Sequence, residues 1–200
     1  MKPRLDHKIL QFRDNRKQES IENNDEIDSN SITHVFLQAG VGGMAAAMIA
    51  GFAKLSKNIP KFIIVEPENA DCVLQSIKNN KPTSVHINKE TVMDGMSCGD
   101  VSSIAWKILR NSSNYCLTIP DEAISTTVAL LAEKRLSDEK IRAGECAVPG
   151  IIALIGSFNN KEYLDKLELN EQSNVLLFGC EGLTDNAMYQ KLLNDGLQKI

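Results

Sequence analysis

The sequence predicts an α/β fold in which a parallel sheet carries helices on both faces, giving three layers. Two observations lead to this. Short apolar segments alternate with segments of helical character from residue 33 onward, and strands that are joined through helices run parallel. The stretch THVFLQAGVGGMAAAMIAGFAKL also passes from an apolar run through a cluster of glycines directly into an alanine-rich helix. Such a strand, turn and helix begin a βαβ unit.

Four segments have the length and apolar character of strands in this sheet: 34–38, 62–66, 115–119 and 175–178. The helices are expected in these places: from the glycine turn to about Lys57, about 69–78, around Trp106, from Pro120 to about Arg135, about 148–158, and from about Asn186. Pro120 ends the third strand and suits the first turn of a helix, where a backbone N–H would have no partner within the helix.

The bulk properties limit the class of protein. The 200 residues are 42% hydrophobic and 24% charged, as in one globular domain, and the net charge of −4 argues against a nucleic-acid binder. No segment approaches the ~20 apolar residues of a membrane span. The five cysteines form no CxxC pair and the three histidines have no metal-like spacing, so we expect reduced thiols, a cytoplasmic location and no metal site. Residues 1–31 are mostly polar, and we expect a mobile leader there.

The glycine turn has the features of a phosphate-binding site. Glycines let the backbone approach an anion closely, and the first N–H groups of the helix point at it with the positive end of the helix dipole. The binding segment consists of Gly40, Val41, Gly42, Gly43, Met44 and Ala45. The chain has no GKS or GKT here, which excludes a nucleoside-triphosphate P-loop.

Two other interpretations of the turn stay open from the residues alone. Gly40, Gly42 and Ala45 satisfy GxGxxA, and Glu66 ends the second strand near where a dinucleotide fold places its ribose-binding acid. The segment would then be an NAD-binding Rossmann module. Alternatively, the glycines form a tight strand–helix turn that binds no ligand.

Five segments extend the evidence beyond the turn, in this order: GVGGMAAAMIAGF, VEPENADCVLQS, TVMDGMSCGDVSSIAW, AGECAVPG and FGCEGLTD. Together they resemble the C-terminal half of the fold-type II pyridoxal-phosphate enzymes, the tryptophan synthase β and threonine dehydratase group, and within it the diaminopropionate ammonia-lyases. The resemblance covers Thr33 to about Gln198. It implies pyridoxal 5′-phosphate as the cofactor and a tryptophan synthase β-like fold, here incomplete, with residues 32–200 as the C-terminal part of the large domain.

The resemblance also assigns roles to residues. The segment from Gly40 to Ala45 would bind the cofactor phosphate. Asp94 and Gly95 of TVMDG would lie near the ring or its closing loop, the alternative being a turn at the start of a helix with Asp94 as N-cap. Glu145 of AGECAVPG would belong to the active-site wall, although the following Cys146 and Pro149 depart from the pattern of the relatives.

Cys180 stands where relatives place a Ser, Thr or Cys opposite the pyridine nitrogen. A thiol is a weak partner, so it does not force the nitrogen to carry a proton as an aspartate would. Such a ring suits α-proton removal followed by β-elimination, which gives pyruvate and ammonia. The alternative is a buried packing cysteine.

The catalytic lysine of these enzymes is not recognisable in this chain. In the family it lies in the N-terminal half, which residues 1–31 do not resemble, and Lys54, Lys57 and Lys61 lie at the far end of the phosphate helix and beyond it. We therefore expect a fragment of a diaminopropionate ammonia-lyase that lacks the Schiff-base lysine and is inactive alone on its small amino-acid substrate. A homodimer or a complementary N-terminal half would be its partner. A non-catalytic interaction remnant fits the same residues.

Overall fold

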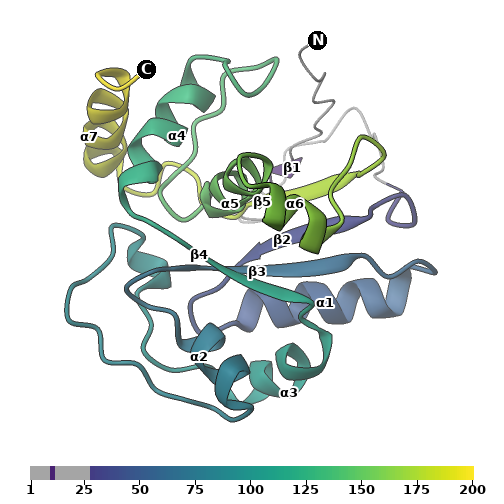
Figure 1. Cartoon of the computed structure of the whole chain (residues 1–200). Coiled ribbons are helices and arrows are strands. Elements are labelled where there is room, and N and C mark those ends of the chain that lie inside the picture. The colour runs from purple at the N-terminus through teal and green to yellow at the C-terminus, as the bar shows by residue number, and fades with distance from the viewer. Residues whose placement is uncertain (1–9, 12–27) are drawn as a thin grey trace, which may run out of the picture.

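A parallel sheet forms the centre of the molecule, as the sequence predicts. The structure is a computed structural model that describes residues 10–11 and 28–200. Its strands, in the spatial order β1-β5-β2-β3-β4 (Figure 1), are β1 Leu10–Gln11, β2 His34–Gln38, β3 Lys61–Pro67, β4 Tyr115–Ile119 and β5 Val175–Gly179. All neighbouring strands pair in parallel. The predicted leader falls almost entirely on residues 1–9 and 12–27, which lie outside the described residues.

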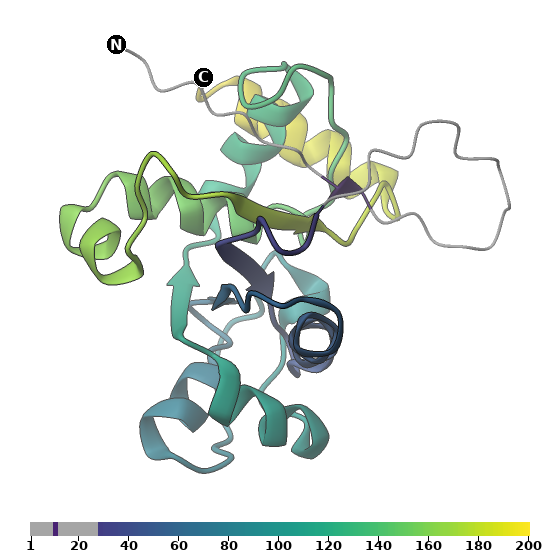
Figure 2. The same ribbon diagram turned by 90° about the vertical axis from the view of Figure 1, so that its right-hand side faces the viewer.

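Helices cover the sheet on both sides and complete the three layers. Their bounds are α1 Gly43–Leu55, α2 Cys72–Asn79, α3 Ser103–Ser112, α4 Glu122–Ala132, α5 Pro149–Phe158, α6 Lys161–Leu167 and α7 Asn186–Leu197, with a short 3-10 helix, η1, at Asp94–Met96. Helices α1, α2 and α3 lie on one side and α5 and α6 on the other, while α4 and α7 pack along each other (Figures 1 and 2). None of these helices is long and apolar enough to cross a membrane.

The strands bury residues on both faces, because each face packs against helices. Phe36 and Ile63 belong to the core shared with α4, α5 and α7, whereas Val35 and Ile64 belong to the core shared with α1 and α3. All five residues of β2 are accordingly buried, the pattern expected for a central parallel strand. Gly150 lets α5 approach the sheet closely, since a Cβ there would lie 3.4 Å from Cβ of Phe36.

Three elements differ from the sequence-based expectation. Strand β1, which pairs with β5, lies in the segment expected to be a leader and is not among the predicted strands, because two residues carry no recognisable pattern. Helix α4 begins at Glu122, because Pro120 lies in a turn before it, closed by a hydrogen bond from the N–H of Ala123 to the carbonyl of Pro120 (3.3 Å). Helix α6 is missing from the predicted elements. It begins at a cap, Asn160, whose side chain accepts the N–H groups of Glu162 and Tyr163, and a helix of only seven residues is too short for a clear periodic pattern.

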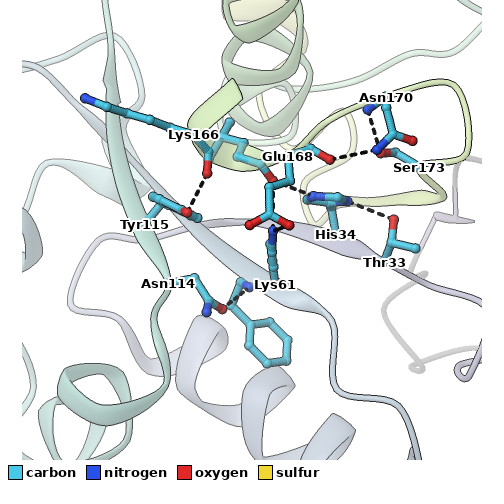
Figure 3. Close-up of polar contacts among 11 residues, drawn as sticks. Thr33, His34, Lys61, Asn114, Tyr115, Lys166, Glu168, Asn170 and Ser173 are labelled. Carbon is cyan, nitrogen blue, oxygen red and sulfur yellow. Dashed lines mark hydrogen bonds and ion pairs between the residues drawn. The ribbon is translucent and has the colours of Figure 1, made fainter. Parts of the chain in front are cut away.

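Polar contacts close the end of the sheet where the strands begin (Figure 3). The Lys61 ammonium lies 2.6 Å from the Glu168 carboxylate. The His34 ring contacts the Leu167 carbonyl through Nε2 (2.8 Å) and the Thr33 hydroxyl through Nδ1 (2.8 Å). Burial of His34 lowers its pKa, which keeps the ring neutral. These contacts fasten the end of α6 to the first residues of β2 and β3.

Candidate functional site

A ligand site is expected at the opposite end of the sheet, between β2 and β5. From β2 the chain moves through β3 to β4 and then returns to the other side of β2 as β5. In open α/β sheets, ligands bind in the crevice outside the carboxyl ends of the strands at such a reversal. The glycine turn follows β2 and Cys180 follows β5, so both border this crevice.

The glycine turn leaves the first backbone N–H groups of α1 without acceptors. Gly42 is the N-cap, with φ of +84° and ψ of +3°, a left-handed conformation that glycine adopts readily. The N–H of Ala46 already reaches the Gly42 carbonyl (3.0 Å). Among the described residues, no acceptor meets the N–H groups of Gly43, Met44 or Ala45. Donors arranged in this way at a helix start favour an anion.

Packing distinguishes the three glycines of the turn. A Cβ at Gly40 would lie 3.0 Å from the Gly95 carbonyl oxygen, and one at Gly42 would lie 2.6 Å from Cδ1 of Leu109. Nothing lies within 4 Å of a Cβ at Gly43. Gly40 and Gly42 are therefore required by close neighbours, whereas Gly43 faces the open space from which an anion could approach.

The other residues of the turn support it. Val41 is 46% exposed, and its carbonyl accepts the N–H of Ser102 (2.9 Å), which ties the turn to the start of α3. Ala45 is fully buried and Met44 is half-buried. The backbone of Val41 also hydrogen-bonds the Cys98 thiol. The turn is thus fixed by neighbouring residues, while the N–H groups of Gly43, Met44 and Ala45 have no acceptor among the described residues.

The TVMDG segment packs beside the turn. The Thr91 hydroxyl and the Val92 N–H both donate to the Asp121 carboxylate, which holds the segment in place. Gly95 lies between two predicted site segments: its carbonyl faces Gly40, and a Cβ there would lie 3.4 Å from Sγ of Cys146.

Asp94 does not act as the cap that the alternative interpretation assigned to it. It is the first residue of η1, and the N-cap of α3 is Ser102, whose hydroxyl accepts the Ala105 N–H. The Asp94 charge does reach the crevice, since it contributes to the raised pKa of Glu145. Its predicted place near the ring stays a prediction.

Glu145 lies in the crevice wall among other acidic groups and is 9% exposed. Burial raises the pKa of Glu145, and the charges of Glu181, Asp185 and Asp94 raise it further. The N–H of Cys146 donates to Glu181 Oε2 (2.6 Å), so this segment is tied to the one that follows β5. Pro149, which departs from the pattern of the relatives, occupies the first position of α5, where proline is favourable.

Cys180 is exposed, unlike the packing cysteine of the alternative interpretation. Its sulfur lies 3.5 Å from the Cys146 carbonyl oxygen and 3.3 Å from Nε2 of Gln38. Burial of part of the thiol raises its pKa, against which the hydrogen bond from Gln38 acts. The thiol therefore stays protonated near neutral pH.

Gln38 is a site residue that the sequence analysis does not identify. It is the last residue of β2 and 4% exposed. Its Nε2 lies 2.6 Å from the Phe178 carbonyl oxygen and 3.1 Å from that of Cys146, while its Oε1 is buried without a partner among the described residues. The signal in the sequence is a polar residue that ends an apolar strand directly before the glycines.

The carboxylate of Glu66, near the end of β3, is hydrogen-bonded to the first turn of α2. Glu66 is fully buried, and its carboxylate accepts the N–H groups of Val73 and Leu74 at 2.8 Å each. Burial raises the pKa of Glu66 to about 7, although these hydrogen bonds lower it. Both oxygens serve to cap α2, so this environment offers no support for a ribose-binding role.

The charges that act most strongly on the crevice groups are negative. The charged groups that raise the pKa values of Glu145, Cys146 and Cys180 are carboxylates alone. Lys61, one of the lysines beyond the phosphate helix, lies at the other end of the sheet, paired with Glu168. The expectation that the Schiff-base lysine is not among these residues stays a prediction.

One group of side chains has the spacing of metal ligands. Atoms of Glu145, Cys146 and Glu181 lie within 4.8 Å of one another. However, Glu181 already accepts hydrogen bonds from the Cys146 N–H and the Thr184 hydroxyl. The expectation that no metal is needed stays a prediction.

Comparison with known proteins identifies the family. The model of the family "Pyridoxal-phosphate dependent enzyme" matches residues 19–180. The chain belongs to this family. The resemblance seen in the sequence is thereby confirmed, as is pyridoxal phosphate as the cofactor of the family.

Curated relatives specify the resemblance further. Diaminopropionate ammonia-lyase of Salmonella typhimurium is 32% identical over 178 residues, covering 86% of this chain and 44% of the relative. The enzyme of the same name from Escherichia coli K12 is 31% identical over 168 residues, covering 82% and 42%. The chain thus spans less than half the length of the curated relatives it matches.

Solved structures confirm the fold. The Escherichia coli diaminopropionate ammonia-lyase in complex with D-serine matches with a TM-score of 0.73 and 30% identity, covering 82% of this chain and 42% of that one. The processed form of threonine deaminase isoform 2 from Solanum lycopersicum matches with a TM-score of 0.67 and 17% identity, covering 84% and 43%, and shows the fold alone. The predicted tryptophan synthase β-like fold, present here in part, is confirmed.

Proposed function

We propose that this chain forms the phosphate-binding part of a pyridoxal-phosphate-dependent carbon–nitrogen lyase of the diaminopropionate ammonia-lyase type. The observation that carries the proposal is the set of free N–H groups at the start of α1, at the reversal of strand order. The relatives at 31–32% identity support the substrate class. When bound, pyridoxal phosphate supplies an electron-withdrawing ring that favours α-proton removal and β-elimination from an amino acid.

The residues present fit this cofactor. The N–H groups of Gly43, Met44 and Ala45 would donate to the phosphate, since Gly42 turns the backbone so that they have no acceptor within the described residues. The open space at Gly43 leaves the phosphate room. Cys180, exposed at the end of β5, would meet the ring nitrogen as a weak, uncharged partner.

The proposal assigns the remaining chemistry to a lysine from elsewhere. Covalent attachment of the cofactor and transfer of the α-proton need an amine, whereas the charged groups that act most strongly on Glu145, Cys146 and Cys180 are carboxylates. We therefore expect that these 200 residues alone form no pyruvate from 2,3-diaminopropionate. A complementary N-terminal half would bring the lysine, a second copy of this chain is an alternative partner, and the cytoplasm is the expected location.

Titration with pyridoxal phosphate tests the phosphate site. Gly43→Asp adds a negative charge where no neighbour is crowded, and Gly51→Asp makes the same change further along α1, where a Cβ also meets nothing within 4 Å. We expect Gly43→Asp to weaken binding at least about tenfold by charge repulsion. Gly43→Ala and Gly51→Asp should bind like the wild type.

The pair of aspartate variants decides the outcome. If both weaken binding equally, the effect is one of net charge and the cradle is not at Gly43. If neither weakens it, the phosphate binds elsewhere and the proposal fails.

A further inference from the structure

We propose that Gln38 is a positioning residue of this site, whose side-chain amide holds the Cys180 sulfur at the end of β5 and supplies a hydrogen-bond donor to it. This inference rests on the proposed function, because it concerns the thiol that would meet the ring nitrogen. Gln38 ends β2 and Cys180 follows β5, so their contact spans the reversal of strand order.

The orientation of the amide follows from its neighbours. The Gln38 Nε2 position faces the carbonyl oxygens of Phe178 and Cys146 and the sulfur of Cys180. An amide oxygen in that position would lie 2.6 Å from the Phe178 carbonyl oxygen, and two acceptors repel each other at this distance. Nitrogen must therefore occupy this position, which makes Gln38 the donor.

The three acceptors share two amide hydrogens. The shortest contact, to Phe178, takes one hydrogen, and the second can go to Cys146 or to the Cys180 sulfur. If it goes to the sulfur, the thiol hydrogen can donate to the Cys146 carbonyl at 3.5 Å. The sulfur then keeps a lone pair for a protonated ring nitrogen.

In the second arrangement, the Cys180 thiol is a donor to the ring nitrogen rather than an acceptor from it. If the amide hydrogen goes to Cys146, the Cys180 thiol hydrogen is free to donate to an unprotonated ring nitrogen. Cys180 can thus serve as donor or acceptor without movement of any heavy atom. In both arrangements Gln38 stays beside the sulfur and keeps it at the end of β5.

The groups around Cys180 predict how its titration depends on Gln38. Glu181 follows it in the chain, and its negative charge raises the pKa of the thiol. Cys146, from the segment before α5, contributes a carbonyl oxygen rather than a charge. Among the described residues, Gln38 supplies the side-chain donor that stabilises the thiolate. Removing this donor should raise the pKa of Cys180.

Alkylation of Cys180 by iodoacetamide as a function of pH, followed by peptide mass spectrometry, tests the inference on the whole chain without cofactor. We expect Gln38→Met to shift the rate profile of Cys180 to higher pH, with alkylation about tenfold slower at about pH 8. Ser157→Ala is the control, because it removes another buried hydrogen bond, to Ala153 (2.7 Å), with no contact to Cys180. Its Cys180 profile should match the wild type.

An unchanged profile in Gln38→Met, or an equal shift in Ser157→Ala, overturns the inference. If Gln38→Met does not fold, Gln38→Leu replaces it: this smaller apolar side chain cannot donate either, so the Cys180 profile should shift to higher pH in the same way. A wild-type profile there overturns the inference equally. Since no cofactor is used, failure to bind pyridoxal phosphate would refute the proposed function separately.

Discussion

The two ends of the central sheet differ in how completely their polar groups are paired. At the amino ends of β2 and β3, Lys61 pairs with Glu168, and both ring nitrogens of His34 have partners (Figure 3). At the carboxyl ends, the N–H groups after Gly42 lack acceptors among the described residues, and Gln38 Oε1 is buried without a partner there.

This difference separates structural contacts from candidate binding groups. Leaving a buried polar atom unpaired costs about 1–3 kcal/mol, and among the described residues this applies to Gln38 Oε1 at the carboxyl end and to the hydroxyls of Ser56 and Ser113 before β3 and β4. Only at the carboxyl end does such an atom lie beside a row of N–H groups without acceptors. A bound anion with hydrogen-bonding neighbours would supply the missing partners. The side chains of His34 and Lys61 at the amino end are paired within the chain, whereas the N–H groups at the carboxyl end are ones that a ligand can pair.

The largest expected effect on stability comes from adding a side chain at Gly42, the left-handed residue of the glycine turn. In Gly42→Ala, the new Cβ would lie 2.6 Å from Leu109 and the residue would keep φ near +84°. Strain and overpacking together should lower the free energy of unfolding by about 2–4 kcal/mol in urea denaturation. Gly43→Ala, with open space, should stay within about 1 kcal/mol of the wild type. Equal effects of the two changes would show that the turn is not as tightly packed as described.

A pH comparison sharpens the contrast between the two ends. Burial raises the pKa of Glu66 to about 7 from its ordinary value of 4.5. The folded chain keeps a proton that the unfolded chain releases, so the contribution of Glu66 to stability is full below pH 4.5 and falls as pH rises to about 7. The loss is on the order of 3 kcal/mol. Urea denaturation at about pH 5 and about pH 7.5 should show this decline, and Glu66→Gln should reduce it.

Glu168 at the amino end should behave in the opposite way. Its hydrogen bond and ion pair with Lys61 lower its pKa, so its stabilising contribution is present above its ordinary pKa and is lost as pH falls through the lowered value. Because Glu168 is exposed, Glu168→Gln should change the pH dependence of the free energy of unfolding less than Glu66→Gln does. A decline between these two pH values that persists unchanged in Glu66→Gln would contradict this contrast.

The fold was predictable because its signals are local. The strands 34–38 and 115–119 match β2 and β4 residue for residue, since short apolar runs between turn residues carry their own pattern. The glycine turn was predictable for the same reason: Gly42 needs its positive φ within a short strand–helix connection.

The site was predictable only in part, because its side chains meet over long distances in sequence. Gln38 contacts Phe178 across 140 residues, and no local pattern signals such a pair. Glu66 shows the reverse case. Its position at the end of β3 suggested a ribose ligand, but α2 folds back so that its own N–H groups occupy the carboxylate.

The central claim is that this chain holds a phosphate cradle whose lysine comes from elsewhere. The most direct measurement is to incubate the purified chain with pyridoxal phosphate, reduce it with borohydride, and map pyridoxyl-lysine by mass spectrometry. The account predicts only substoichiometric adducts, scattered over exposed lysines. A single stoichiometric adduct would contradict it, because the chain would then carry its own Schiff-base lysine.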